Sequence, residues 1–358
     1  MSAQLDTQRL AGTAAATAAA ADRNRALDDL VVREMVDAGI TRHFVPAEYG
    51  GTAGSHEALL DAVLEVSSRC ASAGWVASVL AYSARFGRFL PPEGQAELWT
   101  AGPDSLVAGA LVPGGTAVAT GDTWHVAGRW SYVSAAPWAQ WVFACVNDGD
   151  DPLFALLPRD QFRVETDWDT VGMRGTASHT IVVADSTVPS YRTFRRSVLL
   201  AGATPSRPIA PLRAVSGLTF AAPVAGAGRG ALADLLDSAK RPPSPQVAWA
   251  AGELDAADLL LRRAATVADH SQDGTVQPGL AARSLRDTAL AAQFVAAAIA
   301  RISAAAGSSG QHAARPIARF TRDVQTAVTH VALRFDTAAA PYLSSLHEAP
   351  YDTKERTP

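Results

Sequence analysis

Apolar residues recur every three or four positions through much of the first hundred residues, which predicts amphipathic helices. The clearest stretch contains Leu27, Leu30, Val31, Met35 and Val36, and the glycine that follows, Gly39, is typical of a helix end. Helical spacing returns over residues 57–68 and 75–90. Before residue 57, the proline and paired glycines of Phe44-Val-Pro-Ala-Glu-Tyr-Gly-Gly51 indicate a loop.

From about residue 105 to residue 190 the pattern changes to short runs rich in β-branched and aromatic residues. Glycine, asparagine and proline turns separate these runs, which is typical of an antiparallel β unit. Five of the eight tryptophans also fall here, either as core filling or as the wall of a slot for a planar ring. The expected strands are Thr116–Ala119, Trp124–Ala127, Trp141–Val146, Leu153–Leu157 and Thr180–Val183.

Helical periodicity dominates the rest of the chain. Four long helices are expected, over residues 213–240, 246–270, 278–306 and 316–346, with breaks at Pro242–Pro245, Gln272–Gly274 and Gly307–Gly310. Long helices joined by short loops favour an antiparallel bundle. The predicted fold is therefore α+β, with an N-terminal helical domain (1–104), a middle antiparallel β domain (105–190) and a C-terminal four-helix bundle (191–358).

The last expected helix has two stripes at steps of three and four residues. One is apolar and contains Ile317, Phe320, Val324, Val328, Val331 and Phe335. The other is polar and contains Arg319, Asp323, Thr326, His330, Arg334 and Thr337. The polar stripe is either a solvated face with paired charges or the wall of a pocket. In a pocket, His330 would suit proton transfer near neutral pH.

A glycine-rich segment, Gly226-Ala-Gly228-Arg-Gly230-Ala231, matches a loose dinucleotide-binding pattern. That pattern requires a strand before it and a parallel sheet around it, whereas here Pro223 precedes it within a helical stretch. We therefore interpret the segment as a helix–helix packing motif.

Composition excludes several classes of protein. A net charge of −4 with mixed signs argues against nucleic-acid and membrane surfaces. The N-terminus lacks the features of a signal peptide, and residues 289–306 are expected to be too weakly apolar to span a bilayer, so a cytoplasmic protein is predicted. Cys70 and Cys145 are interpreted as buried thiols, and the scattered histidines predict no metal site.

Several segments, in order, resemble the acyl-CoA dehydrogenase fold family, and in particular its two-component flavin-dependent monooxygenases. The resemblance is carried by Val45–Gly51, by Ser72-Ala-Gly-Trp75 through Trp99, by Gly128-Arg-Trp-Ser-Tyr-Val-Ser134, by Val171-Gly-Met-Arg-Gly-Thr-Ala-Ser178, and by Arg315–Asp323 with His330. Together these segments span most of the chain from Phe44 to Tyr342.

The resemblance implies roles for individual residues. Ser134 matches the hydroxyl beside flavin N5, and Ser178 ends the second segment of the flavin site. Tyr132 matches an aromatic residue near the ring, and Arg283 resembles an arginine that reaches a flavin, often across a subunit interface. His330 matches the histidine proposed as catalytic, with Arg322 or Asp323 as candidates to orient it.

The sequence departs from the family pattern at two places. Ala135 stands where a glycine usually follows the serine. Tyr82 or Ser83 stands where some relatives carry a substrate-binding histidine, so the resemblance does not specify the substrate.

The implied activity is hydroxylation of a phenolic substrate, such as a polyketide, with O2 and reduced flavin. FMN is expected and FAD is possible. His330 would act as the base, and a separate NAD(P)H-dependent reductase would supply the flavin because the sequence has no convincing nicotinamide site. A homotetramer is also expected from the family.

Two enzyme alternatives share the fold. An acyl-CoA dehydrogenase needs a carboxylate base, but its usual C-terminal Tyr-Glu-Gly motif is absent, and only Glu253 or Asp255 could replace it. An amino-sugar N-oxygenase would need no phenol base.

Overall fold

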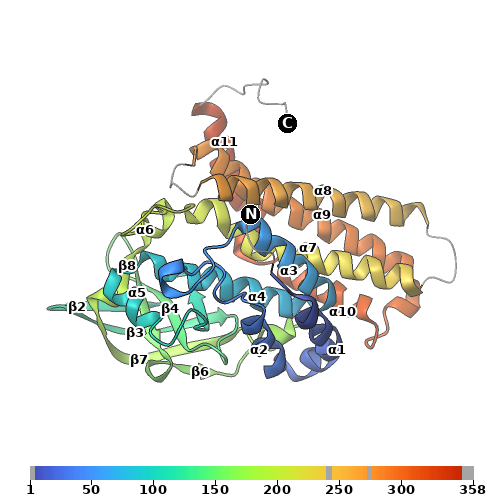
Figure 1. The fold of residues 1–358 in the computed structure, drawn as a ribbon. Helices are drawn as coiled ribbons and strands as arrows, with labels where there is room; N and C mark the ends of the chain where they lie inside the picture. Colours follow the sequence, from blue (N-terminus) through green and yellow to red (C-terminus); the bar gives the residue numbers. More distant parts are fainter. Residues whose placement is uncertain (1–4, 239–243, 272–275, 349–358) are drawn as a thin grey trace.

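The computed structural model describes residues 5–238, 244–271 and 276–348, and Figure 1 shows a β unit beside a group of long helices. The chain begins with helices as predicted. Ser55 caps one of them by accepting a hydrogen bond from the Ala58 N–H (3.2 Å), and Gly39 follows another with a φ of 78°. The N-terminal helices are α1 (Gln8–Asn24), α2 (Asp29–Asp37), α3 (His56–Arg69), α4 (Ala71–Ala84) and α5 (Pro92–Leu98).

The middle of the chain forms two four-stranded sheets in the described residues, in the orders β1-β4-β5-β8 and β2-β3-β7-β6. Every expected strand is present, and the pairs are antiparallel except that β1 runs parallel to β4. Sequence patterns did not reveal the short strands β1, β6 and β8. The strands are β1 (Val107–Ala110), β2 (Gly115–Thr120), β3 (Thr123–Val133), β4 (Trp141–Val146), β5 (Leu153–Pro158), β6 (Arg163–Glu165), β7 (His179–Pro189) and β8 (Thr193–Arg195).

The C-terminal part contains the long helices seen beside the β unit in Figure 1. Helix α7 packs against α3, α4, α8, α9 and α10, and so connects the N-terminal helices to the bundle. The division of the chain at residues 104 and 190 stays a prediction. The helices are α6 (Arg196–Ala201), α7 (Leu212–Ser238), α8 (Pro245–His270), α9 (Pro278–Gly310), α10 (Pro316–Ala327) and α11 (Phe335–Glu348).

The glycine-rich segment lies inside α7 and packs against other helices, as predicted. A Cβ atom on Gly226 would lie 2.7 Å from the Leu64 carbonyl oxygen of α3, and one on Gly230 would lie 2.2 Å from the Ser68 carbonyl oxygen. These distances are too short for any side chain. Glycine therefore allows the two helix backbones to approach closely.

The prediction of one continuous helix over residues 316–346 is wrong. Helix α10 ends at Ala327, and a short 3-10 helix, η6 (Val331–Leu333), precedes α11. His330 caps η6, because its Nδ1 atom accepts a hydrogen bond from the Ala332 N–H (3.2 Å). After this break Leu333 is buried, whereas Val331 is 54% exposed, so the expected stripes do not continue.

Helix α9 is long and apolar enough to cross a membrane by length and composition alone, contrary to the expectation for its residues 289–306. It packs against α7, α8, α10 and α11, as the core helix of a bundle does. Its expected end at Gly307–Gly310 is instead a kink, because Gly307 has a φ of 62° inside the helix. The expected break at Gln272–Gly274 lies outside the described residues, and so does part of the break at Pro242–Pro245.

Candidate active site

Three side chains from separate elements meet where β3 ends. The Trp75 indole N–H on α4 donates a hydrogen bond to Ser134 Oγ (3.0 Å), and Ser134 Oγ lies 2.8 Å from Ser178 Oγ. Thr176 Oγ1 extends this series of hydrogen-bonded hydroxyl groups and lies 2.7 Å from Ser178 Oγ. The two serines named by the resemblance are therefore neighbours, although 44 residues separate them in sequence.

The backbone around these hydroxyls is strained. Tyr132, Ala135, Met173 and Ala177 all have positive φ angles, of 65°, 64°, 54° and 45°. Non-glycine residues seldom adopt this conformation, and such residues gather at functional sites. The Ala135 N–H donates to the Thr176 carbonyl (3.1 Å), which joins the two strained segments.

His330 lies beside the same cluster. Its ring is 3.8 Å from the Phe220 ring on α7 and 5.6 Å from the Trp75 ring, measured between centroids. Burial lowers the pKa of His330 to about 4, because the surrounding aromatic rings do not solvate a charged imidazole. The imidazole is therefore neutral at neutral pH.

The tautomer of His330 follows from its hydrogen bond. Because Nδ1 accepts the Ala332 N–H, a neutral ring must carry its hydrogen on Nε2. His330 thus presents a donor, not a free base, on the side away from its own backbone.

Neither Arg322 nor Asp323 orients His330, so this expectation is wrong. Asp323 is buried, and its Oδ1 atom accepts the Met173 N–H (2.6 Å). Arg322 donates to the Val171 carbonyl (3.0 Å) and to Asp22 (2.6 Å). Arg322 and Asp323 of α10 therefore hold the segment that leads to Ser178.

Burial raises the pKa of Asp323 to about 6, because it disfavours the carboxylate more strongly than the hydrogen bond from the Met173 N–H favours it. Gly172 permits the close approach, since a Cβ atom there would lie 2.1 Å from the Arg322 carbonyl oxygen.

An exposed aromatic surface lies beside the hydroxyl cluster. Tyr132 is 77% exposed, and its ring meets the Trp168 ring in an edge-on arrangement, with 6.1 Å between the ring centroids. Trp168 is held by a hydrogen bond from its indole N–H to the Met173 carbonyl (3.1 Å). Aromatic surface next to paired hydroxyls is the set of groups that a planar, polar-edged isoalloxazine requires, so the residues present fit a flavin.

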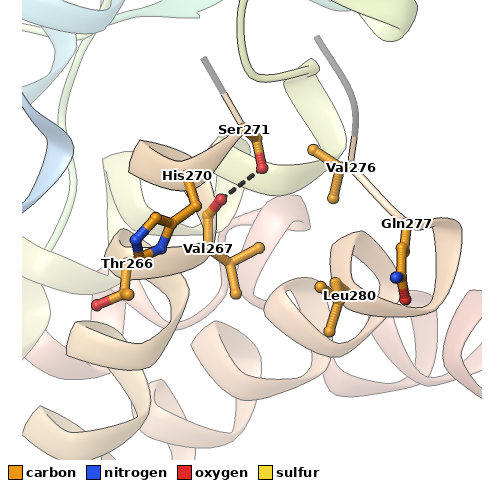
Figure 2. Close-up of a pocket in the computed structure, with 7 residues that line it drawn as sticks. All are labelled: Thr266, Val267, His270, Ser271, Val276, Gln277 and Leu280. Carbon is orange, nitrogen blue, oxygen red and sulfur yellow. Dashed lines mark hydrogen bonds between the residues drawn. The ribbon is translucent and has the colours of Figure 1, made fainter. Parts of the chain in front are cut away.

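Arg283 lies elsewhere, near the start of α9. It forms no hydrogen bond or ion pair with any residue that the structure describes, and nothing links it to Ser134 within this chain. An open pocket of about 580 Å³ occurs in this region, where α8 ends and α9 begins, and Figure 2 shows its lining. The lining residues are Thr266, Val267, His270, Ser271, Val276, Gln277 and Leu280, none of which belongs to the hydroxyl cluster. A role for Arg283 toward a flavin stays a prediction.

Sequence reasoning did not identify two residues that complete the site, Phe220 and Thr176, and it quoted Trp75 only as part of a matching segment. Phe220 belongs to a helical stretch with ordinary apolar spacing, so nothing in its pattern indicated a contact with His330. Thr176 was visible as one of the small polar residues before Ser178.

Comparisons with known proteins identify the family of the chain. The model of the acyl-CoA dehydrogenase N-terminal domain matches residues 7–88, and that of the C-terminal domain matches residues 218–335. A pigment production hydroxylase of Rhodococcus sp. is 30% identical over 344 residues, which cover 89% of each chain. The oxygenase component of an FADH2-dependent resorcinol hydroxylase of Rhizobium sp. is 28% identical over 329 residues, covering 81% of this chain and 80% of the relative.

Among solved structures, the HsaA monooxygenase of Mycobacterium tuberculosis superimposes with a TM-score of 0.88 at 26% identity, covering 96% of each chain. The chain belongs to the acyl-CoA dehydrogenase family. Within that family it is a flavin-dependent monooxygenase, and therefore an oxidoreductase that uses flavin and O2.

Proposed function

We propose that the chain is the oxygenase component of a two-component system and that it hydroxylates a phenolic ring. The observation that carries this proposal is the position of His330, whose ring contacts both Phe220 and Trp75, while Trp75 donates its indole N–H to Ser134 Oγ. A flat aromatic substrate would pack against this group of aromatic rings, and His330 would supply a polar group to fix its orientation. The relatives' names, resorcinol hydroxylase among them, support a phenolic substrate.

A reduced flavin supplies the activation of O2 when it is bound. Ser134 and Ser178 would hold the polar edge of its ring, and Tyr132 would lie against the ring. Trp75 and Phe220 would keep water away from the reacting atoms, which protects reactive species from side reactions.

We further propose that His330 acts as a hydrogen-bond donor rather than as the base expected from the sequence. With Nδ1 occupied by the Ala332 N–H, the Nε2–H can donate to the oxygen of a bound phenolate. A neutral donor in a dry site stabilises developing negative charge strongly. The phenolate form has the more electron-rich ring, so this contact would favour hydroxylation.

The partners follow from the same family. A separate NAD(P)H-dependent flavin reductase is proposed because the resorcinol hydroxylase relative is named as an oxygenase component. The same name specifies FADH2, so we propose FAD rather than the FMN first expected. The homotetramer and the cytoplasmic location stay predictions.

The test is a coupled assay with a flavin reductase, NADH, FAD and resorcinol, in which hydroxylated product is measured for the wild type and two variants. His330→Ala removes the donor and should lower the rate of product formation by about a hundredfold or more. His330→Gln places an amide N–H near the original Nε2–H and should retain activity within about tenfold of the wild type.

The outcomes separate the two roles of His330. Equal losses in both variants would support a base and contradict the donor. Full hydroxylation by His330→Ala would remove His330 from the reaction altogether. Absence of product from resorcinol and from related phenols with the wild type would contradict the proposed function.

A further inference from the structure

A stripe of polar side chains runs through the buried contact between α4 and α7. Ser78, Tyr82 and Arg85 follow Trp75 at spacings of three, seven and ten residues, and so lie on one side of the helix. All fourteen residues of α4 are buried, so this polar side faces protein and not solvent. The stripe starts at the ring that touches His330.

Two members of the stripe bond to α7 or to the segment before it, whereas Tyr82 packs against Phe44 and His56. Ser78 Oγ donates a hydrogen bond to the Thr219 carbonyl (2.7 Å), next to Phe220. At the other end, Arg85 donates through Nη2 to the Ala210 carbonyl. The two elements therefore run side by side in opposite directions, with the proposed reaction site at one end and Arg85 at the other.

Arg85 is a buried cation that forms no ion pair in the part of the chain that the structure describes. Its side chain is 2% exposed, and its Nη1 atom has no hydrogen-bond partner among the residues that the structure describes. Within those residues Arg85 also forms no ion pair, and the charged residue with the largest effect on it is another cation, Arg88. Burial lowers the pKa of Arg85 to about 9, so the guanidinium is still protonated at neutral pH.

Among the residues that the structure describes, the nearby carboxylate of Asp269 forms hydrogen bonds with other groups. Asp269, whose charge reaches Tyr82, accepts the N–H groups of His56 and Glu57 instead (2.6 and 3.1 Å). The Tyr82 hydroxyl pairs with His56 Nδ1 (3.1 Å), and burial keeps the pKa of His56 well below its usual value, so that ring is neutral.

A buried charge is normally paired, because removing it from water costs far more than hydrogen bonds to carbonyl groups return. The free Nη1 atom therefore needs an acceptor, and the single positive charge calls for a single negative one. A carboxylate meets both requirements, since its two oxygens match the planar fork of a guanidinium.

We propose that Arg85 binds the carboxylate of the aromatic substrate, so that this enzyme acts on phenolic acids. This inference rests on the proposed function. Ten residues of helix separate Trp75 from Arg85, which is about 15 Å at the usual rise per residue. The acid group of a fitting substrate is therefore separated from the reacting ring by a chain of several atoms or by a further ring.

The test compares a phenolic acid with its uncharged counterpart. The probes are ω-(meta-hydroxyphenyl)hexanoate, which has a free carboxylate, its methyl ester, and the short acid meta-hydroxybenzoate, each added to enzyme that holds oxidised FAD. Binding is measured by quenching of tryptophan fluorescence and by the shift in melting temperature. Turnover of each probe is then measured with the reductase.

The wild type should bind the hexanoate at least tenfold more tightly than the ester or the short acid. Arg85→Met should bind acid and ester equally. Arg88→Met removes a cation three residues away on the same side of the chain and should keep the preference for the acid.

Equal binding of acid and ester by the wild type would overturn the proposal, and this comparison decides the question even if Arg85→Met does not fold. An unchanged preference for the acid in Arg85→Met would also overturn it. Failure of the proposed function looks different, because then neither acid nor ester is hydroxylated. Equal hydroxylation of both would leave the function intact and remove only the role of Arg85.

Discussion

The α7 contacts and the hydroxyl cluster both bring backbone segments close together, but they are built in opposite ways. In α7, small residues allow regular helices to touch, as at Gly226 and Gly230. At the hydroxyl cluster, residues with side chains adopt conformations that suit glycine, as at Ala135 and Met173. Glycine avoids steric clashes between the helices, whereas residues at the hydroxyl cluster keep strained backbone conformations.

This difference indicates what each region contributes. Close helix packing stabilises the fold and tolerates no added atoms. The strained segments lower stability locally and are kept in place by hydrogen bonds from other elements, such as that from the Met173 N–H to Asp323. Substitutions in the first region should change stability, and substitutions in the second should change stability and the site together.

The largest effect is expected for Gly230→Ala. The new methyl group would lie 2.2 Å from the Ser68 carbonyl and 2.7 Å from Phe320, so the helices must separate. We expect the free energy of unfolding to fall by about 3 kcal/mol, measured by urea denaturation. Gly252→Ala on α8 is the matched control, because nothing lies within 4 Å of its new methyl group. That variant should gain about 0.5 to 1 kcal/mol from helix propensity.

The same contrast explains how far the sequence could predict the molecule. Helices, strands and the packing role of the glycine-rich segment follow from local patterns, and five expected strands are all present. The break at His330 does not follow, because Val328 and Val331 continue the helical spacing. There the hydrogen bond to the Ala332 N–H and the burial of Leu333 prevail over the local pattern.

For the site, the resemblance identified Ser134 and Ser178, which the structure brings together. It could not reveal which residues hold them. The contact of Trp75 with Ser134 joins positions 59 residues apart, and that of Met173 with Asp323 joins positions 150 residues apart. Such contacts depend on the packing of whole elements, so a pattern within one segment does not show them.

The next largest effect concerns the pH dependence of stability at the junction of the two regions. The folded protein raises the pKa of Asp323 from 3.8 to about 6 and so binds this proton more tightly than the unfolded chain does. The contribution of the Asp323 carboxyl group to the free energy of unfolding is therefore fully present below about pH 4, and it is lost as the pH rises to about 6. One pKa unit corresponds to about 1.4 kcal/mol, so the loss is about 3 kcal/mol.

Asp323→Asn keeps an oxygen for the Met173 N–H but cannot titrate, so its stability should not fall over this pH range. The measurement is urea denaturation of both proteins at several pH values, with the difference between them plotted. This difference removes the opposite effect of buried histidines such as His330, whose lowered pKa costs stability on acidification. Asp122→Asn, at an exposed turn, is the control, and its free energy of unfolding should change with pH in parallel with that of the wild type. A parallel curve for Asp323→Asn would show that Asp323 is not desolvated as the contact requires.

The smallest effect is expected where the strain itself is removed. Ala135 has a φ of 64°, a conformation that glycine adopts without strain, so Ala135→Gly should relieve a conformational cost of about 1 kcal/mol. Part of that gain is lost with the buried methyl group, and we expect a net increase of about 0.5 kcal/mol in the free energy of unfolding. Ala15→Gly, on the exposed side of α1, should instead cost about 1 kcal/mol. Equal losses in the two variants would mean that Ala135 is not strained. A gain in stability at Ala135 with a loss of hydroxylation would show that the strain serves to position Ser134.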